Sequence, residues 1–181
     1  MRTKRLSAAV IGLGCLLLSI SIVRAAQDRF ALKAPDGIGF SEFRGYDNWQ
    51  PVAPSQTDDG IKSIFANPVM IKAYRDGVPG NGKAFPEGSK IVKIEWTKKR
   101  NPASPYTVFV PDTLKSVSFI EKDSKRFPDT NGWGYAQFLY DPAADRFKPF
   151  GSDSSFGRTV CHECHLRVKN QDYIFTRYAK R

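Results

Sequence analysis

Side chains that commonly bind transition metals are scarce in this sequence of 181 residues, which contains two histidines, three cysteines and two methionines. A structural zinc site needs about four such ligands, usually as two separated pairs. Beyond the first 25 residues, one methionine remains, and every remaining cysteine and histidine lies in a single stretch of five residues. This scarcity argues against a zinc finger. The sequence also contains no internal repeat and no low-complexity tract.

The five-residue stretch reads Cys161-His162-Glu163-Cys164-His165. Two thiols at this spacing can form thioether bonds to the two vinyl groups of one haem, while the following imidazole binds the iron. The motif therefore predicts that Cys161 and Cys164 attach one haem c per chain and that His165 is its axial ligand. Half a zinc site, a redox dithiol and a disulfide are the alternatives. A thioredoxin-like dithiol would stand early in a βαβ unit, whereas this pair lies near the C-terminus.

The N-terminus has the features of an export signal. Three basic residues precede an apolar stretch (residues 8–23), and Val23-Arg24-Ala25 offers a cleavage site. We expect residues 1–25 to be a signal peptide that directs the protein to the periplasm, and residues 26–181 to form one domain. A retained membrane anchor is the alternative, although glycine and serine interrupt the apolar stretch. Export agrees with the haem prediction, because bacteria attach haem c outside the cytoplasm.

The excess of basic residues is partly a property of this leader. Four of the 28 Lys and Arg residues lie in residues 1–25, so the net charge of +10 falls to +6 without them. Such a charge mainly favours solubility and weak attraction to acidic partners. The densest basic run, Lys98-Lys99-Arg100, is typical of a solvated turn, and we expect no nucleic-acid partner.

The remaining pattern predicts an α+β fold, a mainly antiparallel β-sheet with a few short helices and haem attachment near the C-terminus. Asn67-Pro68 predicts a helix that stops at Gly77, because asparagine is a good N-cap and proline is favoured at the first helical position. Residues 91–96 alternate as a half-buried strand, which places Lys93 on one face with Ile91 and Glu95. The helix is expected to bury Val69, Met70, Ala73 and Tyr74. Further strands are expected at residues 61–65, 106–110, 115–120 and 133–140, and a short helix or turn at the aromatic residues 40, 43, 46 and 49.

The chain offers few candidates for a second axial ligand. His162 lies between the attachment cysteines, where the short tether keeps it from the far side of the haem. Met70 stands on an apolar helix face, which favours core packing. We therefore expect an open sixth position, which allows a small molecule or gas to bind, whereas a plain electron carrier would need Met70 on the iron.

Several of these features together resemble the cytochrome P-460 family, which includes the related cytochromes c prime of the beta type. The resemblance rests on the leader, the antiparallel sheet, the haem motif, Lys125-Arg126-Phe127-Pro128 followed by Gly132-Trp133-Gly134-Tyr135, and the closing stretch from Asp172 to Thr176. It covers most of residues 26–181. It implies a homodimer that passes electrons to a redox partner protein.

The resemblance also implies roles for residues around the haem. In members that oxidise hydroxylamine, a lysine is bonded to the haem macrocycle, and Lys93 matches it by position, with Lys90 as the alternative. A distal arginine of the family is matched by Lys62. The distal carboxylate is matched by Asp153, the only acid in residues 151–158, and Phe156 of the same loop is a candidate distal aromatic residue.

Two functional hypotheses follow from the resemblance. The first is an enzyme that oxidises hydroxylamine to nitrous oxide or nitric oxide, with Asp153 accepting protons. The second is a cytochrome c prime beta-like protein that binds nitric oxide or carbon monoxide without turnover. Lys93 favours the first hypothesis, and Phe156 favours the second.

Overall fold

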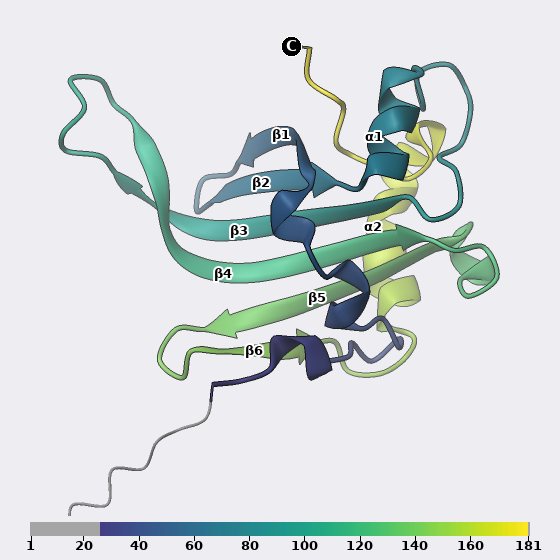
Figure 1. Cartoon of the computed structure of the whole chain (residues 1–181), viewed down its shortest axis with the longest axis horizontal. Helices are drawn as coiled ribbons and strands as arrows, with labels where there is room; N and C mark the ends of the chain where they lie inside the picture. The colour runs from purple at the N-terminus through teal and green to yellow at the C-terminus, as the bar shows by residue number, and fades with distance from the viewer. Residues whose placement is uncertain (1–25, 181) are drawn as a thin grey trace, which may run out of the picture.

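One antiparallel sheet of six strands organises the chain, and the strands follow each other in space as they do in sequence. The computed structural model describes residues 26–180, so the predicted signal peptide lies outside the described residues. The strands are β1 (Gln50–Gln56), β2 (Ile61–Ala66), β3 (Lys90–Arg100), β4 (Phe109–Lys122), β5 (Trp133–Asp141) and β6 (Arg146–Phe150). The prediction of a mainly antiparallel sheet with short helices is confirmed (Figure 1). Among residues 26–180, no helix is long and apolar enough to cross a membrane.

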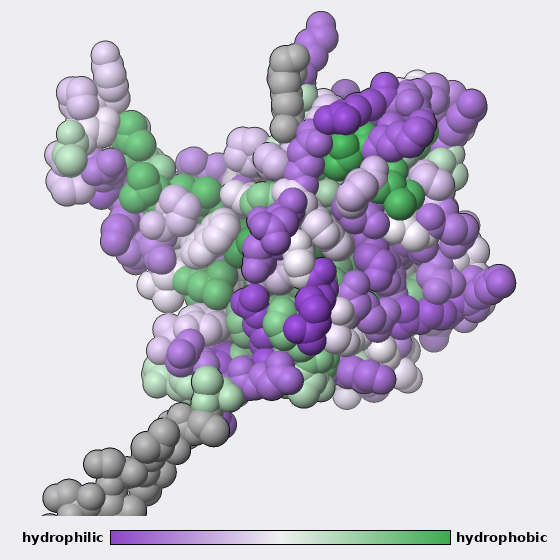
Figure 2. Space-filling model, viewed as in Figure 1, coloured by the Kyte–Doolittle hydropathy of each residue, from purple (hydrophilic) through white to green (hydrophobic). Residues whose placement is uncertain are grey.

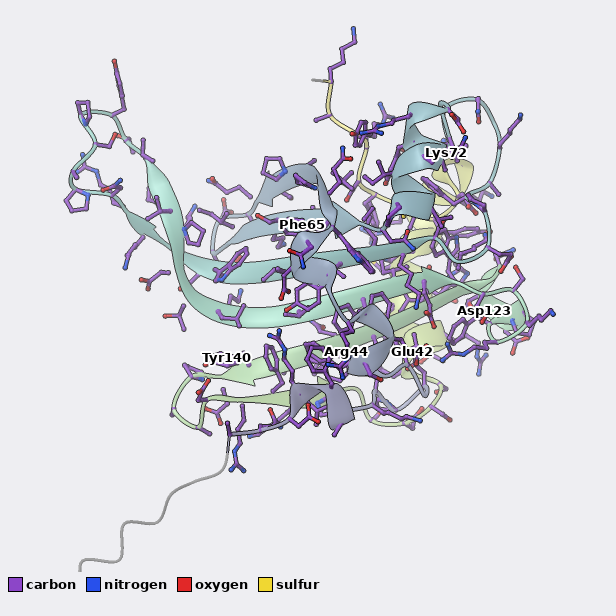
Figure 3. The ribbon with its side chains drawn as sticks, viewed as in Figure 1. Glu42, Arg44, Phe65, Lys72, Asp123 and Tyr140 are labelled. Carbon is purple, nitrogen blue, oxygen red and sulfur yellow. The ribbon has the colours of Figure 1, made fainter. Side chains whose placement is uncertain are left out.

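The N-terminal segment covers one face of the sheet. Its aromatic residues form two short 3-10 helices (Phe40–Phe43 and Tyr46–Asn48), as the aromatic spacing predicts. The rings of Phe40 and Phe43 lie 4.9 and 4.2 Å from the ring of Phe119 in β4. These contacts bury a first core on this face, and Figure 3 shows Glu42 and Arg44 of the same segment in front of the sheet.

The other face is covered by α1 (Pro68–Arg75) and by the C-terminal segment, which contains α2 (Glu163–His165). Helix α1 begins as predicted, because the Asn67 side chain accepts a hydrogen bond from the Met70 backbone N–H at 3.1 Å. Gly77 follows the helix with a φ of +90°. The buried face differs by one residue from the prediction, since Val69 is 42% exposed and Ile71 is buried instead. On the face shown in the space-filling view, polar residues predominate and apolar residues are interspersed among them (Figure 2).

The strands that the sequence did not predict are the two edges of the sheet. Strand β1 contains Pro51 and Pro54, and β6 contains Pro149. Proline cannot donate to a strand ladder and is therefore confined to edges and bulges. Both strands pair on one side only, and the β1 register shifts between Pro51 and Ala53. Proline-rich edges are easily read as loops.

The strands predicted at residues 106–110 and 115–120 belong to one long strand, β4, which begins at Phe109, so residues 106–108 lie in the loop before it. Pro111 lies inside it, where β4 pairs with β3 alone, because β5 joins β4 only from Ser116 onward. The proline therefore has no second neighbour that would require its missing N–H. The outer halves of β3 and β4 project from the domain as a hairpin (Figure 1). Val108, just before β4, and Phe109, its first residue, are exposed.

In the Gly-Trp-Gly-Tyr motif, close packing explains why position 134 is a glycine. A Cβ atom at Gly134 would lie 2.3 Å from the Phe127 ring, which rests directly on the glycine backbone. We expect Gly134→Ala to destabilise the folded protein by about 3 kcal/mol, because the ring must move within a packed region. Urea unfolding of the holoprotein checks this. Gly80→Ala, in an exposed loop, is the control and should cost less than about 0.5 kcal/mol; equal stability of the two variants would contradict the packing argument.

Candidate functional site

A cavity of about 400 Å³ lies between the sheet and the C-terminal segment. Its volume is in the range typical of cofactor and ligand sites. Strands β1 to β5 supply one wall, and the residues around and after the Cys-x-x-Cys-His motif supply the other. The lining is mainly apolar, with isoleucines from both walls: Ile64, Ile91, Ile120 and Ile174.

Both cysteines of the motif line this cavity. A π-helical turn (Gly157–His162) carries Cys161, and α2 carries Cys164. Neither thiol is in a disulfide, and Cys161 is half-buried whereas Cys164 is exposed. Burial raises the pKa of the Cys161 thiol to about 11, with a further contribution from the charge of Asp36. Cys161 is therefore a thiol rather than a thiolate at neutral pH.

The ring of His165 is fixed from three directions. Its Nδ1 lies 2.6 Å from the carbonyl oxygen of Tyr173. Since a carbonyl only accepts, Nδ1 carries the hydrogen, and the lone pair is on Nε2. The rings of Tyr135 and Phe175 lie 4.8 and 4.9 Å from the imidazole. Burial lowers the pKa of His165, so the ring is held neutral with one nitrogen available to a metal.

The other histidine of the motif, His162, is packed in the protein interior. His162 is 4% exposed, and its Nδ1 lies 3.0 Å from the Tyr135 hydroxyl. The Tyr173 ring packs on it at a centroid distance of 4.9 Å. His162 is not among the cavity-lining residues, and neither is Met70, which is fully buried in the core beside α1. The core position predicted for Met70 is therefore confirmed.

The structure separates Lys93 clearly from its alternative, Lys90. Lys93 lies on the cavity face of β3, next to Ile64 and Ser118 of the neighbouring strands. Burial lowers the pKa of its amine, and the charge of Glu95 partly opposes this. Lys90 lies on the opposite face, where its Nζ is 3.0 Å from a Glu121 carboxylate oxygen. Of these two lysines, only Lys93 shares a cavity with the cysteines and His165.

Lys62 also lines the cavity, as its match to the family's distal arginine requires. Its Nζ lies 3.9 Å from a carboxylate oxygen of Glu95, whose other oxygen lies 3.0 Å from Lys115. Lys115 in turn pairs with the exposed Asp59 at 3.0 Å. An ion-pair chain thus connects the cavity wall with the surface. The sequence pattern had placed Glu95 on the Lys93 face without assigning it a role.

The other two predicted distal residues lie elsewhere. Asp153 is exposed, and its carboxylate accepts hydrogen bonds from the Ser152 hydroxyl and from the hydroxyl and backbone N–H of Ser155. These bonds hold the pKa of Asp153 below its ordinary value. Phe156 packs on Phe150 at a centroid distance of 5.2 Å. Neither Asp153 nor Phe156 lines the cavity, so their distal roles stay predictions that this placement does not favour.

The reason for this difference is local. A serine-rich loop lets the only acid form a self-contained turn, and sequence position alone cannot show this. The most important residue that the sequence reasoning missed is Tyr135, which contacts both histidines and lines the cavity. Its place in the alternation of β5 is the signal that could have indicated it, since Tyr135 and Gln137 share the cavity face.

Comparison with protein families decides the assignment. The family model of cytochrome P460 matches residues 43–176, which include every cavity residue named above. The chain belongs to the cytochrome P460 family. A search of curated proteins gave no significant match. The family binds haem, and membership indicates a haem protein of the hydroxylamine-oxidising kind.

The residues of the cavity fit the cofactor of the P460 family. Two thiols, a neutral imidazole with its lone pair on Nε2 and four isoleucines converge on one volume. A haem requires these groups: thioether partners, an axial nitrogen and apolar contacts for the macrocycle. Residues 26–180 contain no cluster of three or more His, Cys, Asp and Glu side chains that could hold a free metal ion. The thiols, the imidazole and the apolar lining of the cavity suit a haem.

Proposed function

We propose that this protein is an exported c-type cytochrome with one haem per chain that oxidises hydroxylamine to nitrous oxide or nitric oxide. The observation that carries the proposal is the position of Lys93 in the same cavity as Cys161, Cys164 and His165. In this proposal the protein acts in the periplasm as a homodimer and delivers electrons to a redox partner protein. When bound, the haem supplies an iron that accepts electrons from hydroxylamine.

Several residues of the chain would have separate roles around the haem. Cys161 and Cys164 would hold the haem by thioether bonds, and His165 would donate Nε2 to the iron. Lys93 would carry the bond to the macrocycle, which replaces one N–H of the amine and one C–H of the haem and so needs a two-electron oxidant such as a peroxide; burial favours the neutral amine, which is the nucleophilic form. The isoleucines exclude water from the cavity, which strengthens every polar interaction inside it. The open far side predicted from the lack of a second ligand leaves room for substrate.

Substrate oxidation releases protons, and we assign their removal to the pair of Lys62 and Glu95. Glu95 is largely buried, within ion-pair distance of the cavity residue Lys62. Through Lys115 it connects to Asp59 at the surface. A carboxylate that is linked to the reaction site through a cavity lysine and to solvent through a second lysine can accept protons that the cavity lysine relays. The exposed Asp153 carboxylate, by contrast, accepts hydrogen bonds from serine hydroxyls of its own loop.

Matched isosteric variants of the two carboxylates test this assignment. We expect Glu95→Gln to lower hydroxylamine turnover by about 100-fold, the usual contribution of a general base, with haem content unchanged. Asp153→Asn should stay within about twofold of the wild type, because its carboxylate faces solvent. Steady-state kinetics with a soluble electron acceptor measures both. A large loss in Asp153→Asn with normal turnover in Glu95→Gln would restore the assignment made from the sequence.

A second candidate function has one observation in its favour. Within the described chain, no carboxylate is among the residues that line the cavity. A neutral gas needs no proton acceptor, so this lining also suits a cytochrome c prime beta-like protein that binds nitric oxide or carbon monoxide. Binding of either gas without any hydroxylamine turnover would favour this function. The simple electron carrier has less support, because Met70 is packed in the core away from the cavity lining.

A further inference from the structure

A buried polar cluster lies behind the proximal side of the cavity. The carboxylate of Asp172 accepts hydrogen bonds from Lys122 Nζ at 3.1 Å, Trp133 Nε1 at 3.3 Å and the Phe85 backbone N–H at 2.7 Å. Lys122 also donates to the Asn131 carbonyl at 3.0 Å and lies 4.8 Å from the Trp133 ring centroid. None of these residues lines the cavity. The proposed function gives them no role.

Desolvation makes this cluster costly unless every charge is paired. The side chains of Lys122 and Asp172 are 8% and 10% exposed, and Trp133 is fully buried. Breaking a buried ion pair by removing one partner leaves an uncompensated charge and is strongly destabilising. A hydrophobic pair would fill the same space at lower electrostatic cost. Because this ion pair is not needed to fill the space, we consider which part of the backbone its hydrogen bonds fix.

The cluster fixes a strained stretch of backbone at Asp172 and Tyr173. Asp172 and Tyr173 have φ values of +47° and +63°, and neither is glycine. Left-handed residues of this kind are strained, and they persist only where the surroundings over-determine them. The three strand and loop contacts of the Asp172 carboxylate provide that constraint. Tyr173 follows directly, and its carbonyl is the group that accepts the hydrogen bond from His165 Nδ1 at 2.6 Å.

We infer that Asp172, held by Lys122 and Trp133, is a positioning residue that fixes the Tyr173 carbonyl against His165 and thereby sets the basicity of the axial imidazole. The inference rests on the proposed axial role of His165. A hydrogen bond from Nδ1–H to a fixed acceptor fixes the tautomer of a ligating histidine and increases its donor strength. Strands β4 and β5, which end and begin at Lys122 and Trp133, thus control the electronic properties of the haem from outside the cavity.

Resonance Raman spectra and redox titrations of the holoprotein test this inference. Asp172→Asn removes the charge that pairs with Lys122, and Trp133→Phe removes one donor while it keeps an aromatic ring in place. We expect both variants to lower the iron–histidine stretching frequency of the ferrous protein and to make its midpoint potential more positive, with the larger shift in Asp172→Asn. Both changes reflect a weaker donor. Trp133→Phe alone decides the question if Asp172→Asn does not fold.

The control is Val117→Ala, which opens a space in the core on the opposite face of the sheet. It should lower stability without moving the stretching band or the potential. An unmoved band and potential in Trp133→Phe and in folded Asp172→Asn would overturn the inference, and so would equal shifts in Val117→Ala. An iron–histidine band that is missing from the wild type, or that persists in His165→Ala, would instead contradict the axial role of His165 in the proposed function.

Discussion

Denaturing gels stained for haem are expected to show no band for the double variant Cys161→Ala/Cys164→Ala. Both thiols line the cavity and neither is in a disulfide, so both are available to form thioether bonds. Without them, we expect the haem not to be captured, so that the bond to Lys93 does not form either; a haem in the cavity would then be held only by His165 and by apolar contacts, neither of which survives denaturation. The loss should be complete, whereas each single variant should retain a weaker band through its remaining thioether.

Cys15→Ala is the matched control for this experiment. Cys15 lies in the predicted signal peptide, so the exported protein should carry the same haem content with or without it. A band of normal intensity in the double variant would contradict the assignment of the two cysteines. Adding Lys93→Arg to that variant would then show whether the lysine alone keeps the haem attached.

The central part of the fold could be predicted because its residues obey local rules. Strand β3 alternates between the two cores, with Val92 facing one and Ile91 facing the other. The Asn67-Pro68 pair specifies the start of α1 through a side-chain cap and a fixed backbone angle. Patterns of this kind are complete within a few residues, so they can be recognised without the rest of the chain.

The edges of the fold could not be predicted in the same way. Prolines in β1 and β6 suggest loops unless it is known that these strands pair on one side only. Pro111 is tolerated in β4 for the same reason, since that part of the strand has a single neighbour. Whether a strand is an edge is a property of the whole sheet.

In the candidate site, too, local sequence patterns indicate some residues, whereas others depend on the tertiary fold. The cysteines and His165 are adjacent in sequence, and the alternation of β3 placed Lys93 on the same face as Ile91, both of which line the cavity. Asp153 was chosen as the only acid in its loop, but loop side chains follow no period, and here the serine hydroxyls engage it. The contacts of Tyr135 and Asp172 with distant elements depend on the tertiary fold. Sequence reasoning finds the groups that carry chemistry more readily than those that position them.

Replacing Lys93 by arginine is expected to change the optical spectrum of the reduced protein from a strongly red-shifted Soret band to that of an ordinary c-type cytochrome. Arginine is also a long basic side chain but offers no nucleophilic amine, because its guanidinium is always protonated. The bond between the side chain and the macrocycle would therefore not form. Hydroxylamine turnover should fall at least about tenfold, which corresponds to about 1.4 kcal/mol of lost transition-state stabilisation.

Lys90→Arg is the matched control, with the same substitution three residues earlier on the same strand. Lys90 faces the other side of the sheet, where its amine pairs with Glu121 and donates to the Glu42 carbonyl at 2.9 Å. Arginine preserves that charge, so the Soret band and turnover should stay as in the wild type. An ordinary c-type spectrum in the wild type would remove the crosslink and most of the case for hydroxylamine oxidation. A red-shifted band lost only in Lys90→Arg would mean that the crosslink comes from the face opposite the cysteines, which the geometry of the cavity does not allow.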